Sequence, residues 1–180
     1  LSEAQRLASA LGLKHVIVKE NELEDERFVE NPPDRCYYCK KGLINELRKV
    51  AAREGINVIL DGTNADDLKG HRPGALALME GGVRSPLAEL GFSKTDIRAV
   101  SRALGLPTWA KPSMACLSSR FPYGQRITAE GLRSVAEAES FIRAVTGVSQ
   151  LRVRCHGHLA RIEAGRDERH ILASEEVMDK

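Results

Sequence analysis

The stretch that decides the expected fold reads NVILDGTN, residues 57–64. Residues 57–60 form a short apolar run rich in β-branched side chains, which is typical of a strand. The preceding segment, Leu43–Arg53, has helical periodicity and stops at Gly55. Strand and helix patterns thus alternate, and parallel strands need helical crossovers. The sequence predicts an α/β fold with a parallel sheet and flanking helices.

The same alternation extends in both directions from this stretch. Ser2–Leu11 reads as a helix that ends at Gly12, ahead of a strand at His15–Val18. Downstream, Asp96–Leu104 reads as another helix, closed by Gly105. These segments support the parallel sheet.

The pattern changes after SSRFPYG, residues 118–124. Thr128–Thr146 reads as a long helix with Thr128 as its N-cap, and Gln150–Glu163 alternates as a strand. We therefore expect two parts: residues 1–124, and a small α+β C-terminal subdomain, residues 125–180.

Composition limits the classes of function. A hydrophobic fraction of 42%, a charged fraction of 29% and a net charge of +2 are ordinary for a globular protein and argue against bulk nucleic-acid binding. No apolar run reaches the length of a membrane span, and the first residues resemble an amphipathic helix rather than a secretory signal. Four cysteines then suggest metal or thiol chemistry in a reducing compartment, so we expect a cytoplasmic protein.

A C-x-x-C pair stands in the segment NPPDRCYYCKKGL, residues 31–43. Its prolines predict a loop that delivers Cys36 and Cys39 to the start of a helix from about Lys40. Thiols near a helix N-terminus have lowered pKa values and become good ligands or nucleophiles. Two packed cysteines are the alternative, and a zinc site would need a second ligand pair that the sequence lacks.

A third cysteine lies in KPSMACLSSRFPYG, residues 111–124. Cys116 stands beside Ser118, Ser119 and Arg120, a density of chemistry that is unusual in a plain connection. Together with the C-x-x-C pair it offers three thiolates. Three cysteines could hold a [4Fe-4S] cluster with one iron left open.

Polar residues follow the strand expected at residues 57–60. Asp61, Gly62, Thr63 and Asn64 would lie at the carboxyl end of a parallel strand, where open α/β sheets bind ligands. Asp66 and Asp67 come next and could hold Mg²⁺. A solvated turn is the alternative.

The last segment is LRVRCHGHLARIE, residues 151–163. In a strand, Arg152 and Arg154 share one face with His156, while Cys155 points to the other and is expected in the core. Paired arginines suit a phosphate, which guanidinium groups bind in bidentate fashion. An exposed strand face that carries two arginines is the alternative.

Read together, these segments resemble the LarE family of ATP-dependent sulfur transferases, in the PP-loop ATP-pyrophosphatase superfamily. The resemblance runs from about Glu3 to Glu163, and its strongest motifs are NPPDRCYYCK, LDGTNADD, HRPG, SSRFPYG and the RVR of Arg152–Arg154. It implies an adenine nucleotide alpha hydrolase-like fold, ATP and Mg²⁺, and a homo-oligomer. It also implies that a nicotinic-acid mononucleotide derivative is adenylylated on a carboxylate and converted to a thiocarboxylate for nickel-pincer cofactor synthesis.

The resemblance also assigns roles to residues. The nucleotide side would be Asp61, Gly62, Thr63, Asn64, Asp67 and Arg72, with Asp67 near Mg²⁺. Arg152 and Arg154 would hold the substrate phosphate, Ser119 and Arg120 would orient the reacting groups, and Glu139 would lie near metal and substrate, with a solvated helix residue as its alternative. Cys36, Cys39 and Cys116 match members expected to bind a [4Fe-4S] cluster, whereas Ala115 stands near where a sacrificial cysteine would be placed.

One departure concerns ATP. The superfamily's Ser-Gly-Gly-x-Asp-Ser loop does not occur in these residues. We therefore expect the first strand and the PP-loop to be missing, and this fragment alone to be inactive. The rival interpretations are a tRNA-thiolating enzyme of the same superfamily and a non-enzymatic metal-binding module.

Overall fold

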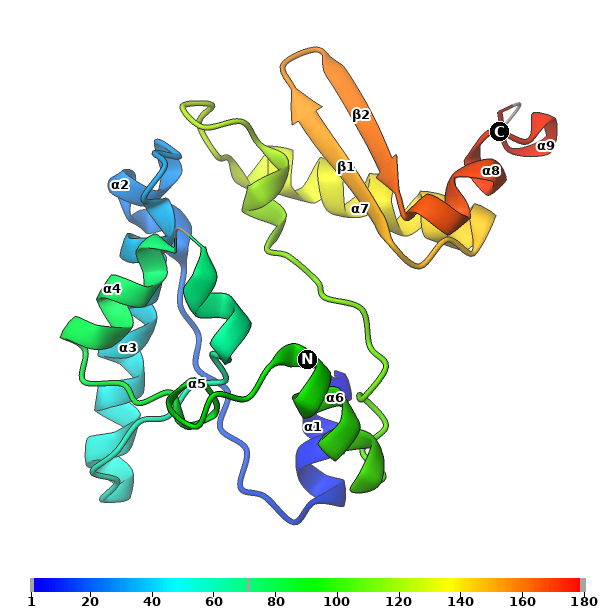
Figure 1. Cartoon of the computed structure of the whole chain (residues 1–180). Coiled ribbons are helices and arrows are strands. Elements are labelled where there is room, and N and C mark those ends of the chain that lie inside the picture. Colours follow the sequence, from blue (N-terminus) through cyan, green and yellow to red (C-terminus); the bar gives the residue numbers. More distant parts are fainter. Residues whose placement is uncertain (1, 71, 179–180) are drawn as a thin grey trace.

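The computed structural model describes residues 2–70 and 72–178 of the chain, so His71 of the HRPG motif lies outside the described residues. Figure 1 shows α2 to α5 on the left, α1 and α6 at the lower centre, and α7, β1 and β2 apart from both at the upper right, reached through an extended segment. The α-helices are α1 (Ser2–Ala10), α2 (Glu26–Val29), α3 (Arg35–Glu54), α4 (Pro73–Glu80), α5 (Pro86–Glu89), α6 (Lys94–Ala103), α7 (Ala129–Thr146), α8 (Arg169–Leu172) and α9 (Glu175–Met178). The 3₁₀ turns are η1 (Glu22–Glu24), η2 (Ala65–Lys69), η3 (Leu117–Arg120) and η4 (Arg166–Glu168), and the strands are β1 (Leu151–His156) and β2 (Leu159–Ala164).

The mixture of helix and strand is confirmed, but the parallel sheet is wrong for the described part of the chain. The one sheet described there is the antiparallel pair of β1 and β2. The strand expected at His15–Val18 is irregular, and Asn57–Leu60 makes a single parallel bridge, from Leu60 to Arg84. A strand needs a hydrogen-bonding neighbour along its length, and neither segment has one among the described residues.

Helix α3 is longer than expected. It begins at Arg35 rather than near Lys40, so Cys36 and Cys39 lie within its first turns and not in a loop. Nothing after the two prolines interrupts the helix until Gly55, which ends it with a φ of 65°.

Helix α4 packs closely on this cysteine-bearing end of α3. Gly74 of α4 makes the approach possible, because a Cβ there would lie 3.3 Å from the backbone oxygen of Cys36 and 3.1 Å from Cγ of Lys40. The RPG motif thus supports the helix that carries the cysteines.

The C-terminal layer is a hairpin packed on a helix. Thr128 caps α7 as expected, since its hydroxyl accepts a hydrogen bond from the N–H of Gly131 at 3.1 Å. The single strand expected at Gln150–Glu163 is instead two antiparallel strands that turn at Gly157, whose φ is 62°. Strand β1 packs against both α7 and η3, which places the Cys116 segment beside the hairpin.

One core cluster joins α2 to α7. Phe28, Val29, Phe121, Ile127 and Val135 are each at most 5% exposed and pack together. This core spans the expected boundary at residue 124, and the division into two domains stays a prediction. Within the described ranges, no helix is both long enough and apolar enough to cross a bilayer.

Candidate active site

A buried asparagine ties the two cysteine-bearing segments together. Asn31 is fully buried with a φ of 55°. Its side-chain Nδ2 donates to the carbonyl oxygens of Pro122, at 2.7 Å, and Gln125, at 3.1 Å. Its own carbonyl accepts from the N–H of Gly124 at 2.9 Å, and the guanidinium of Arg35 donates to Oδ1. These residues, the Asn31 cluster, fix the start of α3 against the segment that follows η3.

The three predicted cysteines lie in this joined region. Cys36 and Cys116 are exposed, and Cys39 is half-buried. Burial raises the pKa of the Cys39 thiol to about 11, and the nearby Glu22 carboxylate, then Cys116, Glu20 and Cys36, add to the increase. The lowered pKa expected for a thiol near a helix N-terminus is therefore wrong for Cys39. That both other cysteines influence this thiol supports their proximity.

Three cysteine thiols are the candidate metal ligands of this region. Among the described residues, no three His, Cys, Asp or Glu side chains gather where one metal ion could bind them. A [4Fe-4S] cluster makes a different demand, because each thiolate binds a different iron. Cys36, Cys39 and Cys116 supply three soft ligands from segments that the Asn31 cluster holds together, so their assignment to a cluster remains a prediction.

Glu139 of α7 is the centre of the site's charges. It is 3% exposed, so the alternative of a solvated helix residue is wrong. Oε1 accepts from Nε of Arg120 at 2.6 Å and from the N–H of Val153 at 3.1 Å, while Oε2 accepts from Arg143 Nη2 at 2.9 Å. Burial alone would raise the pKa of Glu139. The hydrogen bonds from Arg120, Val153 and Arg143 have the larger effect, so the pKa lies below its ordinary value. The carboxylate is ionised and holds η3, α7 and β1 together.

Arg120 also reaches the segment before it. Its Nη1 lies 3.3 Å from the carbonyl oxygens of Ala115 and Cys116 and 3.1 Å from Oγ of Ser119. With Glu139 behind it, this buried guanidinium has one defined orientation. Ser119 and Arg120 thus lie beside the backbone of Cys116, and their roles toward a substrate remain predictions.

The paired arginines of β1 have different surroundings. Arg154 donates from Nη1 to the carbonyl oxygen of Ser119 at 3.0 Å. Its buried Nε lies 2.8 Å from Oε2 of Glu163, with which it forms an ion pair. Arg152 is exposed and lines a cavity. The described structure therefore leaves Arg152 the freer of the two to meet a phosphate.

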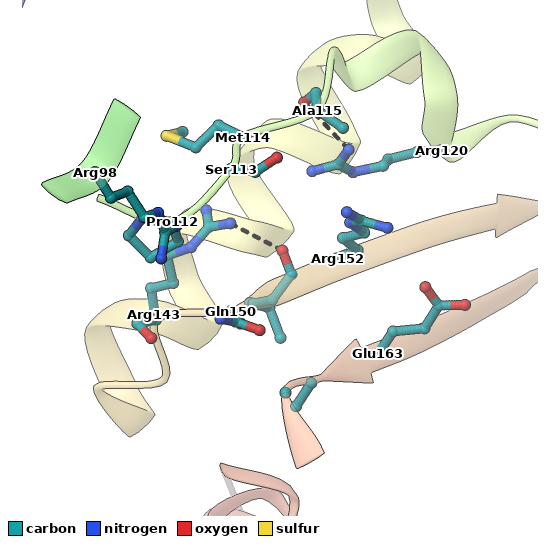
Figure 2. Close-up of a pocket in the computed structure, with 14 residues that line it drawn as sticks. Arg98, Pro112, Ser113, Met114, Ala115, Arg120, Arg143, Gln150, Arg152 and Glu163 are labelled. Atoms are coloured by element: carbon teal, nitrogen blue, oxygen red, sulfur yellow. Dashed lines mark hydrogen bonds between the residues drawn. The ribbon is translucent and has the colours of Figure 1, made fainter. Parts of the chain in front are cut away.

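The cavity beside Arg152 has a volume of about 420 Å³ and is lined by four arginines from three helical segments and a strand. Figure 2 shows the side chains of Arg98, Arg120, Arg143 and Arg152 around it, with Arg143 hydrogen-bonded to the backbone of β1. Sequence reasoning missed Arg98 and Arg143. Charged residues on helices usually face water, and no local signal distinguishes the two that face a cavity.

The residues predicted for the nucleotide side form a turn whose polar groups bond to one another and to residues 84–94. Asp61 accepts hydrogen bonds from Oγ of Ser85 and Oγ1 of Thr63, both at 2.6 Å. Burial raises the pKa of Asp61, but the hydrogen bonds from Ser85 and Thr63 lower it more. Gly62 between them is exposed, with open space around its Cα.

The second half of this turn is a capping box. The side chain of Asn64 accepts from the N–H groups of Asp66 and Asp67, and Asp67 Oδ2 accepts from the N–H of Asn64 at 3.1 Å. The other oxygen of Asp67 pairs with Arg72 at 2.6 Å. Each oxygen of Asp67 thus has one protein partner and keeps a second acceptor position, so the assignment of Mg²⁺ to Asp67 remains a prediction. In the described chain these residues are absent from the lining of the arginine cavity.

Comparison with known proteins gives a relative of stated activity. No protein-family model matches the chain. It is 48% identical over 91% of its length to an uncharacterized protein of Synechocystis sp., and 35% identical over 86% to an uncharacterized protein of Methanocaldococcus jannaschii. It is 40% identical over 89% of its length to a pyridinium-3,5-bisthiocarboxylic acid mononucleotide synthase of Lactiplantibacillus plantarum. The chain spans 60%, 60% and 58%, respectively, of the lengths of these three relatives.

Proposed function

We propose that this chain is part of a LarE-type enzyme, an ATP-dependent sulfur transferase that converts a carboxylate of a pyridinium mononucleotide into a thiocarboxylate for nickel-pincer cofactor synthesis. The observation that carries the proposal is the arginine cavity beside the Cys116 segment, in a chain 40% identical to a synthase of a bisthiocarboxylic acid mononucleotide. A mononucleotide with ring carboxylates carries negative charge on its phosphate at one end and on the carboxylates at the other. Four guanidinium groups around one cavity suit the anionic groups of such a substrate.

The proposed reaction has two steps. A carboxylate oxygen attacks the α-phosphorus of ATP and pyrophosphate leaves, which turns a poor electrophile into an acyl adenylate. A sulfur nucleophile then attacks the acyl carbon, AMP leaves with the C–O bond electrons, and a thiocarboxylate remains. When bound, a [4Fe-4S] cluster would supply sulfide for this second step.

The chain's own residues bind and orient. Arg152 neutralises the phosphate, and Arg120 with Ser119 orients the reacting carboxylate near Cys116. Glu139 does not touch substrate in this proposal; it fixes the guanidinium of Arg120 through two hydrogen bonds of 2.6 and 3.2 Å. Such preorganised cations favour the transition state because they need no reorientation as charge develops.

The Ser-Gly-Gly-x-Asp-Ser loop of the superfamily does not occur in residues 1–180, so none of the residues named here is assigned to enclose the ATP phosphates. The turn from Asp61 to Asp67 would then border the nucleotide without enclosing its phosphates. No step here is routed through Mg²⁺.

The test of activity uses the complete product of the gene, prepared without oxygen and loaded with iron and sulfide. It is incubated with Mg-ATP and pyridinium-3,5-dicarboxylate mononucleotide, and AMP and the thiocarboxylate are measured by mass spectrometry. Arg152→Gln is expected to lose product formation at least tenfold, whereas Arg102→Gln, on an arginine stacked over Trp109, is expected to change it less than twofold. Thiolated tRNA instead of a thiolated mononucleotide would establish the rival tRNA-modifying function.

The cysteine assignment has its own test. Cys36→Ser, Cys39→Ser and Cys116→Ser are each expected to lose most of the iron and of the cluster's visible absorbance. Cys155→Ser is the matched control, because that thiol lies on β1 against Gln125 and the core. Loss of the cluster in Cys155→Ser with retention in Cys36→Ser would refute the assignment.

A further inference from the structure

The arginine cavity has two cationic ends. Figure 2 shows Arg120 and Arg152 toward one side of the cavity and Arg98 and Arg143 toward the other. They come from different elements: η3 and β1 supply the first pair, α6 and α7 the second. A phosphate on Arg152 and a carboxylate on Arg120 use the first end. The proposed function leaves the second end without a ligand.

The carboxylates in and behind the cavity do not neutralise it. Glu139 is shared between Arg120 and Arg143. Glu163 lines the cavity, but its two oxygens pair with Arg154 and Arg161, at 2.8 and 2.6 Å. Four guanidinium groups therefore face one shared carboxylate, and the excess of positive charge calls for an anionic ligand.

Three of the four cavity arginines have a described partner, and Arg98 is the least strongly held of these three. Its side chain is exposed, and its described hydrogen bond, at 3.4 Å, goes to the neutral carbonyl oxygen of Lys111. One turn further along α6, Arg102 instead lies over the ring of Trp109, 4.9 Å from its centroid. The same helix thus has one arginine held by an aromatic ring and one directed to the cavity.

We propose that Arg98 is a specificity-determining residue that binds, together with Arg143, the ring carboxylate not being thiolated. This rests on the proposed function, in which the substrate carries a phosphate and two ring carboxylates. The phosphate and the reacting carboxylate occupy the end at Arg152 and Arg120. The second carboxylate lies at the end formed by Arg98 and Arg143, and the volume of about 420 Å³ is within the range of small-molecule sites.

In this subsite the side chain of Arg143 is held in place by other residues, whereas that of Arg98 is not. Arg143 Nη2 is held by Glu139 at 2.9 Å and by the carbonyl oxygen of Leu151 at 3.0 Å. Replacing it would disturb the buried charges as well as the ligand. Arg98 has no such role, so it is the residue to change.

The experiment is a ligand-by-variant cycle measured by calorimetry on the complete product of the gene. The two ligands are pyridinium-3,5-dicarboxylate mononucleotide and nicotinamide mononucleotide, which shares the phosphate but has no carboxylate. Arg98→Gln is expected to weaken binding of the dicarboxylate roughly tenfold or more and to change binding of the amide less than twofold. Arg98→Lys is expected to fall between, because charge is kept and the bidentate fork is lost.

Two control variants show whether the effect is specific to Arg98. Arg102→Gln should leave both affinities unchanged, and Arg152→Gln should weaken both ligands by a similar factor because the phosphate is common to them. Equal losses for both ligands in Arg98→Gln, or no loss for either, would overturn the role of Arg98. Failure of the unaltered protein to bind either mononucleotide would instead contradict the proposed function, and the inference with it.

Discussion

Two apolar stretches of the chain, residues 57–60 and β1, differ in whether they form a paired strand. In residues 57–60, Val58 is 52% exposed and Leu60 58%, and a single bridge is the only strand pairing described. In β1, Leu151 and Val153 are 4% and 5% exposed, and the strand pairs along its full length. The difference is the partner: β2 follows β1 after a two-residue turn, whereas a parallel partner must come from a distant segment. Apolar β-branched sequence makes a strand only where a neighbour is supplied.

The comparison also separates two kinds of polar residue. Around β1 the buried polar groups belong to a network that crosses elements, centred on Glu139. In the turn after residue 60, the carboxylates of Asp61 and Asp67 serve their own segment and its neighbours. The first arrangement stabilises a site, and the second stabilises a loop.

The largest effect is expected from Glu139→Gln. Removing the carboxylate leaves two arginines facing a neutral amide, and breaking a buried ion pair from one side costs about 3–5 kcal/mol of unfolding free energy. Urea unfolding followed by circular dichroism measures it. Glu137→Gln, at an exposed position on the same helix, is the control and should cost less than about 0.5 kcal/mol.

The same carboxylate predicts a dependence on pH. The folded pKa of Glu139 lies below its ordinary value of 4.5. Its contribution to stability is therefore present above about pH 4.5 and lost as pH falls toward the folded pKa. Glu139→Gln should flatten this acid limb, and an unchanged slope would show that other groups control it.

A smaller loss is expected from Asn31→Ala. The change leaves buried carbonyl oxygens without their donor and places alanine at a φ of 55°, which together should cost about 2–3 kcal/mol. Asn31→Gly removes the same hydrogen bonds, but glycine adopts a φ of 55° without strain. The difference in unfolding free energy between the Ala and Gly variants therefore measures the backbone strain of alanine at this position. Asn45→Ala on the exposed side of α3 should change little. Equal stabilities for Asn31→Ala and Asn45→Ala would contradict the cluster's role.

The next effect is a difference in thiol reactivity. Because the pKa of Cys39 is raised to about 11 from 9.0, the fold holds its thiol form, and any stability gained this way is lost as pH rises through about 11. At pH 8 iodoacetamide should label Cys39 at least roughly tenfold more slowly than Cys36, as measured by peptide mass spectrometry. Glu22→Gln should bring the labelling rate of Cys39 closer to that of Cys36, because the carboxylate that raises the pKa of Cys39 is removed. Similar rates for the two cysteines would show that burial at Cys39 is weaker than described.

The smallest effect is expected at Val58. Val58→Thr should cost less than about 0.5 kcal/mol because the side chain is already half in water. Val153→Thr, the matched change in β1, should cost about 1–3 kcal/mol because it buries a hydroxyl. If both changes cost the same in the complete gene product, residues 57–60 belong to a sheet that residues 1–180 alone do not form.

The predictable parts of the fold were those with local causes. Helix α7 follows from a Thr128 cap, helical periodicity and Gly147, whose φ of 70° ends it. The alternating pattern of residues 150–163 predicts one strand, whereas Gly157 and His158 form a two-residue turn that divides it into β1 and β2. The parallel sheet failed for a non-local reason, since sequence pattern shows which segments can be strands but not whether their neighbours are at hand.

The candidate site divides in the same way. Motifs identified the Cys116 segment, Ser119, Arg120 and the arginines of β1, and the structure brings these together around Glu139. The sequence indicates only that Asn31 lies in a loop, because a single asparagine before two prolines gives no sign that it is buried. Arg98 was missed since its role depends on the position of α6 relative to the hairpin.

The Asn31 hydrogen bonds also set an order of events during synthesis. They join residues 90 to 94 positions apart in sequence, so the corresponding loop must close before they can form. A chain emerging from the ribosome would therefore carry α3 with its two thiols uncovered until about residue 125 has been made. Before that moment Cys36 and Cys39 are carried on α3 without Cys116 held beside them.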